Sequence, residues 1–254
     1  MKKLWNSFKV AFTMYSKIPM PYADFNKDSM EYAMCVFPLI GAIIGGIMIL
    51  WYQLMMIAPF QHGVTTIGYV LIPLLITGGI HLDGFIDTID AKKSYQPKDK
   101  KLEILKDPHI GAFALIYTIL YFLAMVGIWS EVEKRALEVL AVGFVLSRSL
   151  SGLSVVIFPK AKNTGLASMF SEHARKKEVT IILLCYIILC TIGMFVLQPI
   201  LGGLACLTAI CTYLYYYRLS KNQFGGMTGD LAGYFLQSCE LYMAVIVITV
   251  NLFL

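Results

Sequence analysis

The chain alternates between long apolar runs and short polar segments. A helix needs about 20 apolar residues to cross the hydrocarbon core of a bilayer, and runs of this kind lie near residues 35–57, 63–80, 110–129, 136–158, 179–197, 200–217 and 231–253. This pattern predicts an all-α, polytopic integral membrane helix bundle with about seven transmembrane helices. No linker long enough to separate domains is present, so we expect residues 1–254 to form a single membrane-embedded domain.

The N-terminal segment has a different pattern. Aromatic residues recur there at helical spacing, namely Trp5, Phe8, Phe12 and Tyr15. The segment lacks the continuous apolar core of a cleavable signal peptide. It therefore predicts an amphipathic helix at the membrane interface.

Composition supports the prediction of a membrane protein, and the distribution of charge predicts its orientation in the membrane. The chain is 58% hydrophobic and only 15% charged, and most of its 21 lysines and arginines fall in alternate connections between the apolar runs. Because such residues collect in cytoplasmic loops, we expect the N-terminus and the polar loops to be cytoplasmic and the C-terminus to lie outside. The net charge of +5 follows from this topology, and no basic and aromatic patch on a soluble domain indicates a nucleic-acid partner.

The cysteines do not indicate a metal site or disulfides. There are six of them, almost all in apolar runs and without C-x-x-C spacing. We interpret them as packing residues.

One polar segment, H-L-D-G-F-I-D-T-I-D, follows the second apolar run. Asp83, Asp87 and Asp90 stand at i, i+4 and i+7, which places three carboxylates on one face of a helix. Their mutual repulsion would be costly without a positive partner, so the spacing predicts a divalent cation. The alternative is a solvated acidic face balanced by Lys92 and Lys93.

Two residues of the same segment are less specific. His81 could orient a carboxylate or a phosphate, although a single histidine at a membrane boundary is as often structural. Gly84 allows close helix packing or the approach of a substrate.

Two further polar segments belong to the same side of the membrane. One begins at F-P-K-A-K (Phe158–Lys162), and the other is F-G-G-M-T-G-D (Phe224–Asp230). Together with K-D-P-H-I-G (Lys106–Gly111) and the aspartate segment, they can converge on one cytoplasmic site. Gly225 and Gly226 would let the backbone approach a phosphate or sugar closely, whereas ordinary turn formation explains them equally well.

Two ionisable residues interrupt apolar runs. Arg148 and Glu240 would be costly in hydrocarbon and therefore mark a functional interior, unless they form a structural pair with each other or Arg148 snorkels to the membrane interface. Glu240 lies about 15 Å along the helix from Asp230. Both cannot ligate one ion in an unbroken helix, so Glu240 is interpreted as holding a substrate or supporting the site.

These segments resemble a known family, the cobalamin synthases or adenosylcobinamide-GDP ribazoletransferases. The resemblance covers nearly the whole chain, with matching segments at Phe12–Pro21, Phe37–Gly46, Gly78–Asp90, Lys106–Phe113, Ser147–Arg148, Gly165–Phe170 and Gly225–Asp230, followed by Glu240. The combination of H-L-D-G-x-x-D-x-x-D with G-G-x-T-G-D is the most specific part. Ala91–Tyr95 and His109 depart from the family pattern. These departures affect the expected geometry of the loops, whereas all acidic positions of both motifs are kept.

The resemblance implies an enzyme of the last assembly stage of the vitamin B12 coenzyme. It would join α-ribazole, or its 5′-phosphate, to adenosylcobinamide-GDP, release GMP, and form adenosylcobalamin or its 5′-phosphate with Mg²⁺ as cofactor. Asp83, Asp87, Asp90 and Asp230 are the expected metal ligands and catalytic residues, with Asp230 completing the site or acting as base. The expected substrate-binding residues are His81, Lys106, Asp107, Arg148, Gly225, Gly226, Thr228 and Glu240.

The resemblance also bears on location and partners. It implies a multi-pass protein of a bacterial or archaeal cell membrane, in contact with membrane lipid and with its active site facing the cytoplasm. A homo-oligomer or an association with other cobalamin-assembly enzymes is left open.

Three other classes of protein compete with this interpretation. A CDP-alcohol phosphotransferase would carry D-G-x-x-A-R and a prenyltransferase N-D-x-x-D, and neither motif is found here. A transporter would need polar residues along a path through the membrane, whereas these gather at one face. A passive scaffold would not need an aspartate triad.

Overall fold

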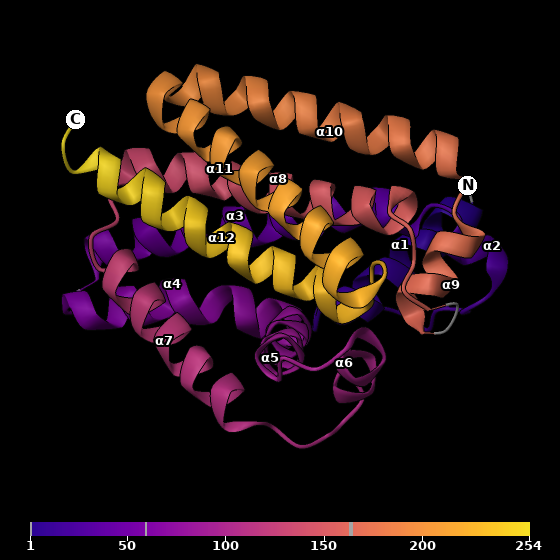
Figure 1. The fold of residues 1–254 in the computed structure, drawn as a ribbon. Coiled ribbons are helices and arrows are strands. Elements are labelled where there is room, and N and C mark those ends of the chain that lie inside the picture. The colour runs from indigo at the N-terminus through magenta and orange to yellow at the C-terminus, as the bar shows by residue number, and fades with distance from the viewer. Residues whose placement is uncertain (1, 59, 163–164) are drawn as a thin grey trace.

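The computed structural model describes residues 2–58, 60–162 and 165–254, and these residues form an array of helices (Figure 1). In chain order the helices are α1 (Lys2–Tyr15), α2 (Lys27–Met30), α3 (Ala33–Ile57), α4 (His62–Thr77), α5 (Ile80–Lys93), α6 (Lys98–Ile104), α7 (Ala112–Trp129), α8 (Lys134–Ile157), α9 (Leu166–His173), α10 (Lys176–Leu197), α11 (Pro199–Leu219) with a π-helical continuation η1 (Ser220–Phe224), and α12 (Gly229–Asn251). This arrangement confirms the all-α prediction.

The long helices account for the membrane spans. Six of them are long and apolar enough to cross a bilayer, namely α3, α7, α8, α10, α11 with η1, and α12. The pair α4 and α5 gives a seventh span if the two helices are counted together. The prediction of a polytopic bundle with about seven spans is therefore confirmed.

The second predicted span ends in a sharp turn. Gly78 and Gly79 adopt left-handed backbone angles, with φ of 66° and 78°, which glycine tolerates better than other residues. The helix axis changes direction there by 95°. As a result α5 leaves the line of α4 and runs across the bundle, where it is seen end-on in Figure 1.

The centre of the bundle consists of α8 and α12, with α3 packed on α8. At Gly41 and Gly45 a Cβ atom would collide with the backbone carbonyl oxygens of Phe144 and Ala141. Two small residues four apart let helix backbones approach closely in membrane bundles. At these two positions the backbones of α3 and α8 pack directly against each other.

The outer helices have the character of a lipid-facing surface. In Figure 1, α10 forms the outermost layer on one side and α7 lies on the opposite side of α12. Large apolar side chains on these helices are exposed, among them Leu123 on α7 and Leu189 and Val196 on α10. All six cysteines are free thiols in the part of the chain that the structure describes.

The N-terminal segment is helical, as its aromatic spacing predicts. Phe12 is buried against the bundle, whereas Trp5 is 54% exposed. An amphipathic helix with one buried and one exposed aromatic side fits the membrane surface. The position of α1 at the lipid interface remains a prediction.

Candidate active site

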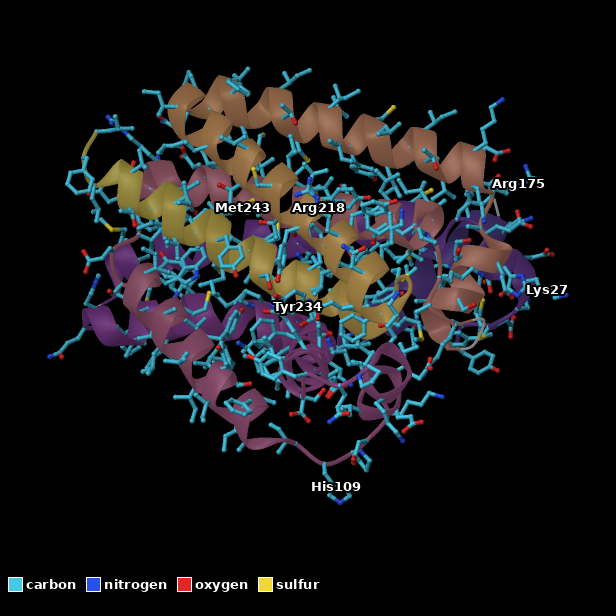
Figure 2. All side chains as sticks on the ribbon, viewed as in Figure 1. Lys27, His109, Arg175, Arg218, Tyr234 and Met243 are labelled. Carbon is cyan, nitrogen blue, oxygen red and sulfur yellow. The ribbon has the colours of Figure 1, made fainter. Side chains whose placement is uncertain are left out.

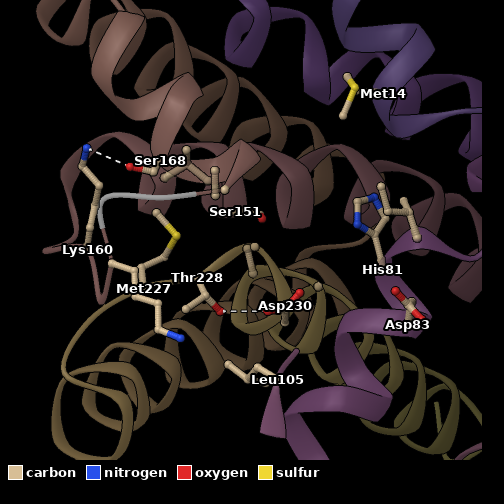
Figure 3. Close-up of a pocket in the computed structure, with 18 of the residues that line it drawn as sticks. Met14, His81, Asp83, Leu105, Ser151, Lys160, Ser168, Met227, Thr228 and Asp230 are labelled. Carbon is tan, nitrogen blue, oxygen red and sulfur yellow. Dashed lines mark hydrogen bonds between the residues drawn. The ribbon is translucent and has the colours of Figure 1, made fainter. Parts of the chain in front are cut away.

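The polar segments meet around one cavity at the end of the bundle where α1, α2 and α9 lie (Figure 3). The cavity has a volume of about 560 Å³. Its charged lining residues are Asp83, Lys106, Lys160, Lys162 and Asp230. They come from α5, from the connections after α6 and α8, and from the start of α12, so segments far apart in the sequence do converge.

Close backbone packing fixes α5 against the start of α12. A Cβ atom at Gly84 would lie 2.8 Å from the Cα atom of Asp230, and one at Gly233 would lie 2.9 Å from the carbonyl oxygen of His81. Only glycine allows the two helices to approach this closely. Because Asp83 precedes Gly84, this packing brings Asp83 and Asp230 to the same cavity.

Asp230 stands in the first turn of α12, where a capping interaction holds the helix end. The side chain of Thr228 accepts a hydrogen bond from the backbone N–H of Leu231 at 3.2 Å and donates one to Oδ2 of Asp230 at 3.5 Å. A carboxylate is also stabilised by the positive end of the helix dipole. The sequence motif T-G-D is thus a helix start that presents a carboxylate.

The two other aspartates of α5 do not line the main cavity. Oδ2 of Asp90 accepts a hydrogen bond from the backbone N–H of Gly111 at 3.2 Å, which links α5 to the beginning of α7. Asp87 is half-buried, and its burial, followed by the charges of Asp83, Asp230 and Asp90, raises its pKa to about 7. The four carboxylates therefore repel one another electrostatically.

We tested whether this set of residues suits a magnesium ion. Among the described residues, no three or more Asp, Glu, His or Cys side chains are grouped closely enough to hold a metal. Mg²⁺ does not require such a cage, because it is commonly bound by one or two carboxylates together with waters and substrate phosphates. The donor atoms are all carboxylate oxygens, which this ion prefers. The residues fit an open magnesium site of this kind.

Lysine side chains form the opposite side of the cavity. Nζ of Lys160 donates to Oε1 of Glu172 at 3.0 Å, and Nζ of Lys162 donates to the carbonyl oxygen of Leu102 at 2.8 Å. Burial and the nearby charge of Lys106 lower the pKa of Lys162. An anion bound beside Lys106 and Lys162 would relieve this repulsion.

The glycine loop before α12 packs against the segment that follows α8. Gly226 lies so close to the backbone of residues 159–161 that a Cβ atom would collide with it. The N–H of Met227 donates to the carbonyl oxygen of Pro159 at 2.8 Å, and the N–H of Ala161 donates to that of Met227 at 3.0 Å. These contacts place Lys160 and Lys162 beside the start of α12. Gly225 and Gly226 do not themselves line the cavity, and their predicted role in substrate binding remains a prediction.

His81 lies at the other end of the cavity from Lys160 (Figure 3). Its ring is 5% exposed and packs 6.0 Å from the ring of Tyr15 and 5.6 Å from that of Phe37. Its Nε2 atom is buried and has no hydrogen-bond partner among the described residues. His81 is therefore placed where the sequence interpretation expected a binding residue.

Asp107 is placed away from the cavity. Its Oδ1 atom accepts hydrogen bonds from the backbone N–H of His109 at 3.0 Å and from the ring Nδ1 of His109 at 2.7 Å. This turn lies in the connection between α6 and α7, with His109 at the outer edge of the molecule (Figure 2). The structure therefore gives Asp107 a role in turn geometry and no contact with the cavity.

Arg148 and Glu240 form a buried ion pair. Nη1 of Arg148 lies 2.7 Å from Oε1 of Glu240, and the two side chains are 1% and 7% exposed. Ser147 Oγ also donates to Oε1 of Glu240, at 2.8 Å. Neither charged residue lines the main cavity. The structure therefore agrees with the interpretation that the two residues form a structural pair. Neither residue is placed where it would contact a substrate in the cavity.

The sequence interpretation missed several residues that line the cavity. They are Tyr15 on α1, Ser151 on α8, Lys160 and Lys162 after α8, and Ser168 on α9. Lys160 and Lys162 could have been identified, because they lie in a polar segment already assigned to this side. Tyr15 and Ser151 carry no such signal, since one looks like an interfacial aromatic and the other like part of a span.

Comparison with known proteins gives consistent results. The family model for cobalamin-5-phosphate synthase matches residues 7–248. An adenosylcobinamide-GDP ribazoletransferase of Lachnoclostridium phytofermentans is 46% identical over 246 residues, which cover 97% of this chain and 94% of the relative. Relatives with the same name from Treponema denticola and Clostridium botulinum are 34% and 30% identical, over 92% and 95% of this chain and 94% and 96% of their own lengths. No solved structure matches the chain.

Proposed function

The chain belongs to the cobalamin-5-phosphate synthase family, and we propose on this basis that it joins ribazole, or ribazole 5′-phosphate, to adenosylcobinamide-GDP. The product is adenosylcobalamin or its 5′-phosphate, and GMP is released. The observation that carries the proposal is the cavity in which Asp83 and Asp230 face Lys106, Lys160 and Lys162. Such a site combines carboxylates for a cation with ammonium groups for phosphates.

The reaction is the transfer of a phosphoryl-linked group from one oxygen to another. A ribose hydroxyl oxygen forms a bond to the phosphorus that carries cobinamide, and the bond from that phosphorus to the GMP oxygen breaks. The hydroxyl proton passes to a base, and GMP leaves with the bonding electron pair. Little covalent chemistry is required of the protein, which must align the two oxygens and stabilise charge.

We assign the base to Asp230. Its carboxylate lies at the cavity and is held at the start of α12 by Thr228, so it can accept a proton from a bound hydroxyl. Asp83 and Asp230, the two carboxylates that line the cavity, would hold Mg²⁺, which would neutralise charge on the phosphate oxygens. The roles of Asp87 and Asp90 as further ligands remain a prediction. Lys106, Lys160 and Lys162 bind further phosphate oxygens and orient the diphosphate.

The size of the cavity limits what it can enclose. At about 560 Å³ it matches the volume that encloses a drug-sized ligand, and the corrinoid ring system with its nucleotide is larger than that. We propose that the reacting diphosphate enters the cavity and that the corrinoid lies at its mouth.

We further propose that the protein resides in the cell membrane with this cavity facing the cytoplasm. The lysines and arginines of the chain concentrate in the connections at this end of the bundle, as the positive-inside rule requires. The substrates are polar and charged, so a site that opens to the aqueous side of the membrane suits them. A transport path is disfavoured because the embedded Arg148 and Glu240 are paired with each other.

The proposal is tested by assaying GMP release from the detergent-solubilised protein. Adenosylcobinamide-GDP and ribazole are supplied with Mg²⁺ or with EDTA, and the corrinoid product is measured in parallel. We expect GMP and corrinoid product in equal amounts, and only with Mg²⁺. No release by a folded sample would refute the activity, whereas release that persists in EDTA would refute the magnesium requirement alone.

A further inference from the structure

A second cavity adjoins the first. It has a volume of about 480 Å³ and lies between the end of α1 and the turn that joins α4 to α5. Met14, Ile80 and Asp83 line both cavities. The Asp83 carboxylate therefore lies where the two spaces meet.

The second cavity is polar and carries one ammonium group. Ser16 and Thr77 line it, but their hydroxyls already donate to the carbonyl oxygens of Phe12 and Pro73, at 2.7 and 2.8 Å. Among the described residues that line it, Lys17 is the one cation and Asp83 the one carboxylate. Lys17 is therefore the charged group through which this cavity can hold an anion.

The position of Lys17 is set by its own backbone and by the glycine turn. Its N–H donates to the carbonyl oxygen of Ile76 at 2.7 Å. Its aliphatic stem lies over Gly78, where a Cβ atom would collide with it. This packing holds the side chain beside the turn that begins α5, and the long stem lets the ammonium reach toward Asp83 or toward a ligand.

Two adjoining cavities suit the geometry of the proposed reaction. In phosphoryl transfer the attacking and leaving oxygens lie roughly in line on opposite sides of the phosphorus. The nucleophile and the activated substrate therefore approach the reacting centre from different sides. The main cavity holds three lysines for the diphosphate, which leaves the second cavity, across Asp83, for the body of the acceptor, whose reacting hydroxyl then extends past Asp83 toward Asp230.

We infer that the second cavity binds the acceptor nucleoside and that the ammonium group of Lys17 binds its 5′-phosphate. The inference rests on the proposed function, since it assigns a place to one of the two substrates of that reaction. It makes Lys17 a specificity-determining residue, which favours ribazole 5′-phosphate over free ribazole.

The test compares the two acceptors. For each protein, kcat/KM is measured with ribazole 5′-phosphate and with ribazole at a saturating concentration of adenosylcobinamide-GDP. The wild-type protein should prefer the phosphorylated acceptor, and Lys17→Met should reduce this preference by roughly tenfold to a hundredfold, as expected for loss of a charged hydrogen bond. Lys17→Arg should keep most of the preference, because it retains the positive charge.

Lys9→Met, on the helix that precedes Lys17, is the matched control. Nζ of Lys9 donates to the carbonyl oxygen of Tyr22 at 2.7 Å, and Lys9 lines neither cavity. This variant should keep the wild-type preference. A change at Lys9 as large as that at Lys17 would mean that any loss of positive charge in the N-terminal segment has the same effect, and would overturn the inference.

A second variant tests the cavity rather than the charge. Ile86 lines the second cavity and not the main one, so Ile86→Trp should raise the KM for either acceptor more than the KM for adenosylcobinamide-GDP. An unchanged acceptor preference in Lys17→Met, or a wild-type protein without preference, would overturn the inference. Failure of the wild-type protein to make product from either acceptor would instead refute the proposed function.

Discussion

Two sets of charged residues in this protein differ in how their charges are balanced. Arg148 and Glu240, deep in the bundle, are paired with each other at 2.7 Å and are almost fully buried. Asp83 and Asp230 instead line a cavity together with lysines, and the pKa of the half-buried Asp87 is raised by its burial and then by the neighbouring carboxylates. The first set is satisfied within the protein, whereas the second leaves charge available to a ligand.

This difference separates two functions that look alike in the sequence. A buried ion pair costs desolvation energy and is stable only with good geometry and further hydrogen bonds, which Ser147 and the carbonyl oxygen of Phe144 provide here. Asp83 and Asp230 share their cavity with lysines but form no such close pair with them among the described residues. We therefore assign a structural role to Arg148 and Glu240 and a role in the reaction to Asp83 and Asp230. The following variants test this assignment.

The largest effect is expected from Asp83→Asn. The change keeps the shape of the side chain but removes a carboxylate from the site, and turnover should fall by at least about a thousandfold, as for loss of a group that stabilises the transition state. Stability should stay within about 0.5 kcal/mol of wild type, because a surface-accessible charge is lost. The same variant at Asp99, which is exposed on α6 outside both cavities, should retain activity, and normal turnover in Asp83→Asn would refute the assignment.

The next effect concerns stability rather than activity. Arg148→Met leaves Glu240 buried without its partner and should lower the free energy of unfolding by about 3 kcal/mol. Arg175→Met removes an exposed arginine that pairs with Glu31 at 3.0 Å and should cost less than about 1 kcal/mol. Thermal unfolding in a mild detergent compares the two, and equal losses would contradict the proposed difference between buried and exposed pairs.

A smaller effect is expected on the lysine side of the cavity. Lys162→Met should raise the KM for adenosylcobinamide-GDP by roughly tenfold, because one charged hydrogen bond to phosphate is lost. Lys221→Met, at an exposed site on η1 outside the cavity, serves as control. If both variants had the same KM, binding of the diphosphate would have to be assigned to other residues.

The smallest effect concerns the support of Asp230. Thr228→Val removes the hydroxyl that caps α12 at the N–H of Leu231 and should reduce stability by about 1 kcal/mol. Thr228→Ser keeps the hydroxyl and should restore most of this loss. Unfolding curves of the two variants measure the difference, which would be absent if the cap contributed nothing.

Hydropathy and motif spacing were sufficient to predict the bundle and the meeting of its polar segments. The alternation of apolar runs placed Asp83 and Asp230 at the same end of the molecule, because connections on one side of a membrane lie close together. The specific contact could not be predicted in this way. It depends on the packing of Gly84 and Gly233 between α5 and α12, which joins segments about 150 residues apart in the chain.

Other details depend on contacts that a linear pattern does not record. The hydropathy pattern did not show that the helix would break at Gly78 and Gly79, or that α5 would turn there by 95°. The sequence left open whether Arg148 and Glu240 pair or bind substrate, since hydropathy shows that a charge is embedded and not which group faces it. Likewise, Gly226 looked suitable for a phosphate, whereas its closest neighbours are the backbone atoms of residues 159–161.

The most direct test of the difference between the two charged sets is Mn²⁺ binding, followed by electron paramagnetic resonance. Mn²⁺ shares the oxygen ligands that Mg²⁺ prefers, and its free form is measured in the presence of wild-type protein, Asp83→Asn and Glu240→Gln. We predict that the wild-type protein and folded Glu240→Gln bind Mn²⁺, that Mg²⁺ displaces it, and that Asp83→Asn binds it at least about tenfold more weakly. Equal binding by Asp83→Asn and the wild-type protein, or loss of binding in a folded Glu240→Gln alone, would contradict the account.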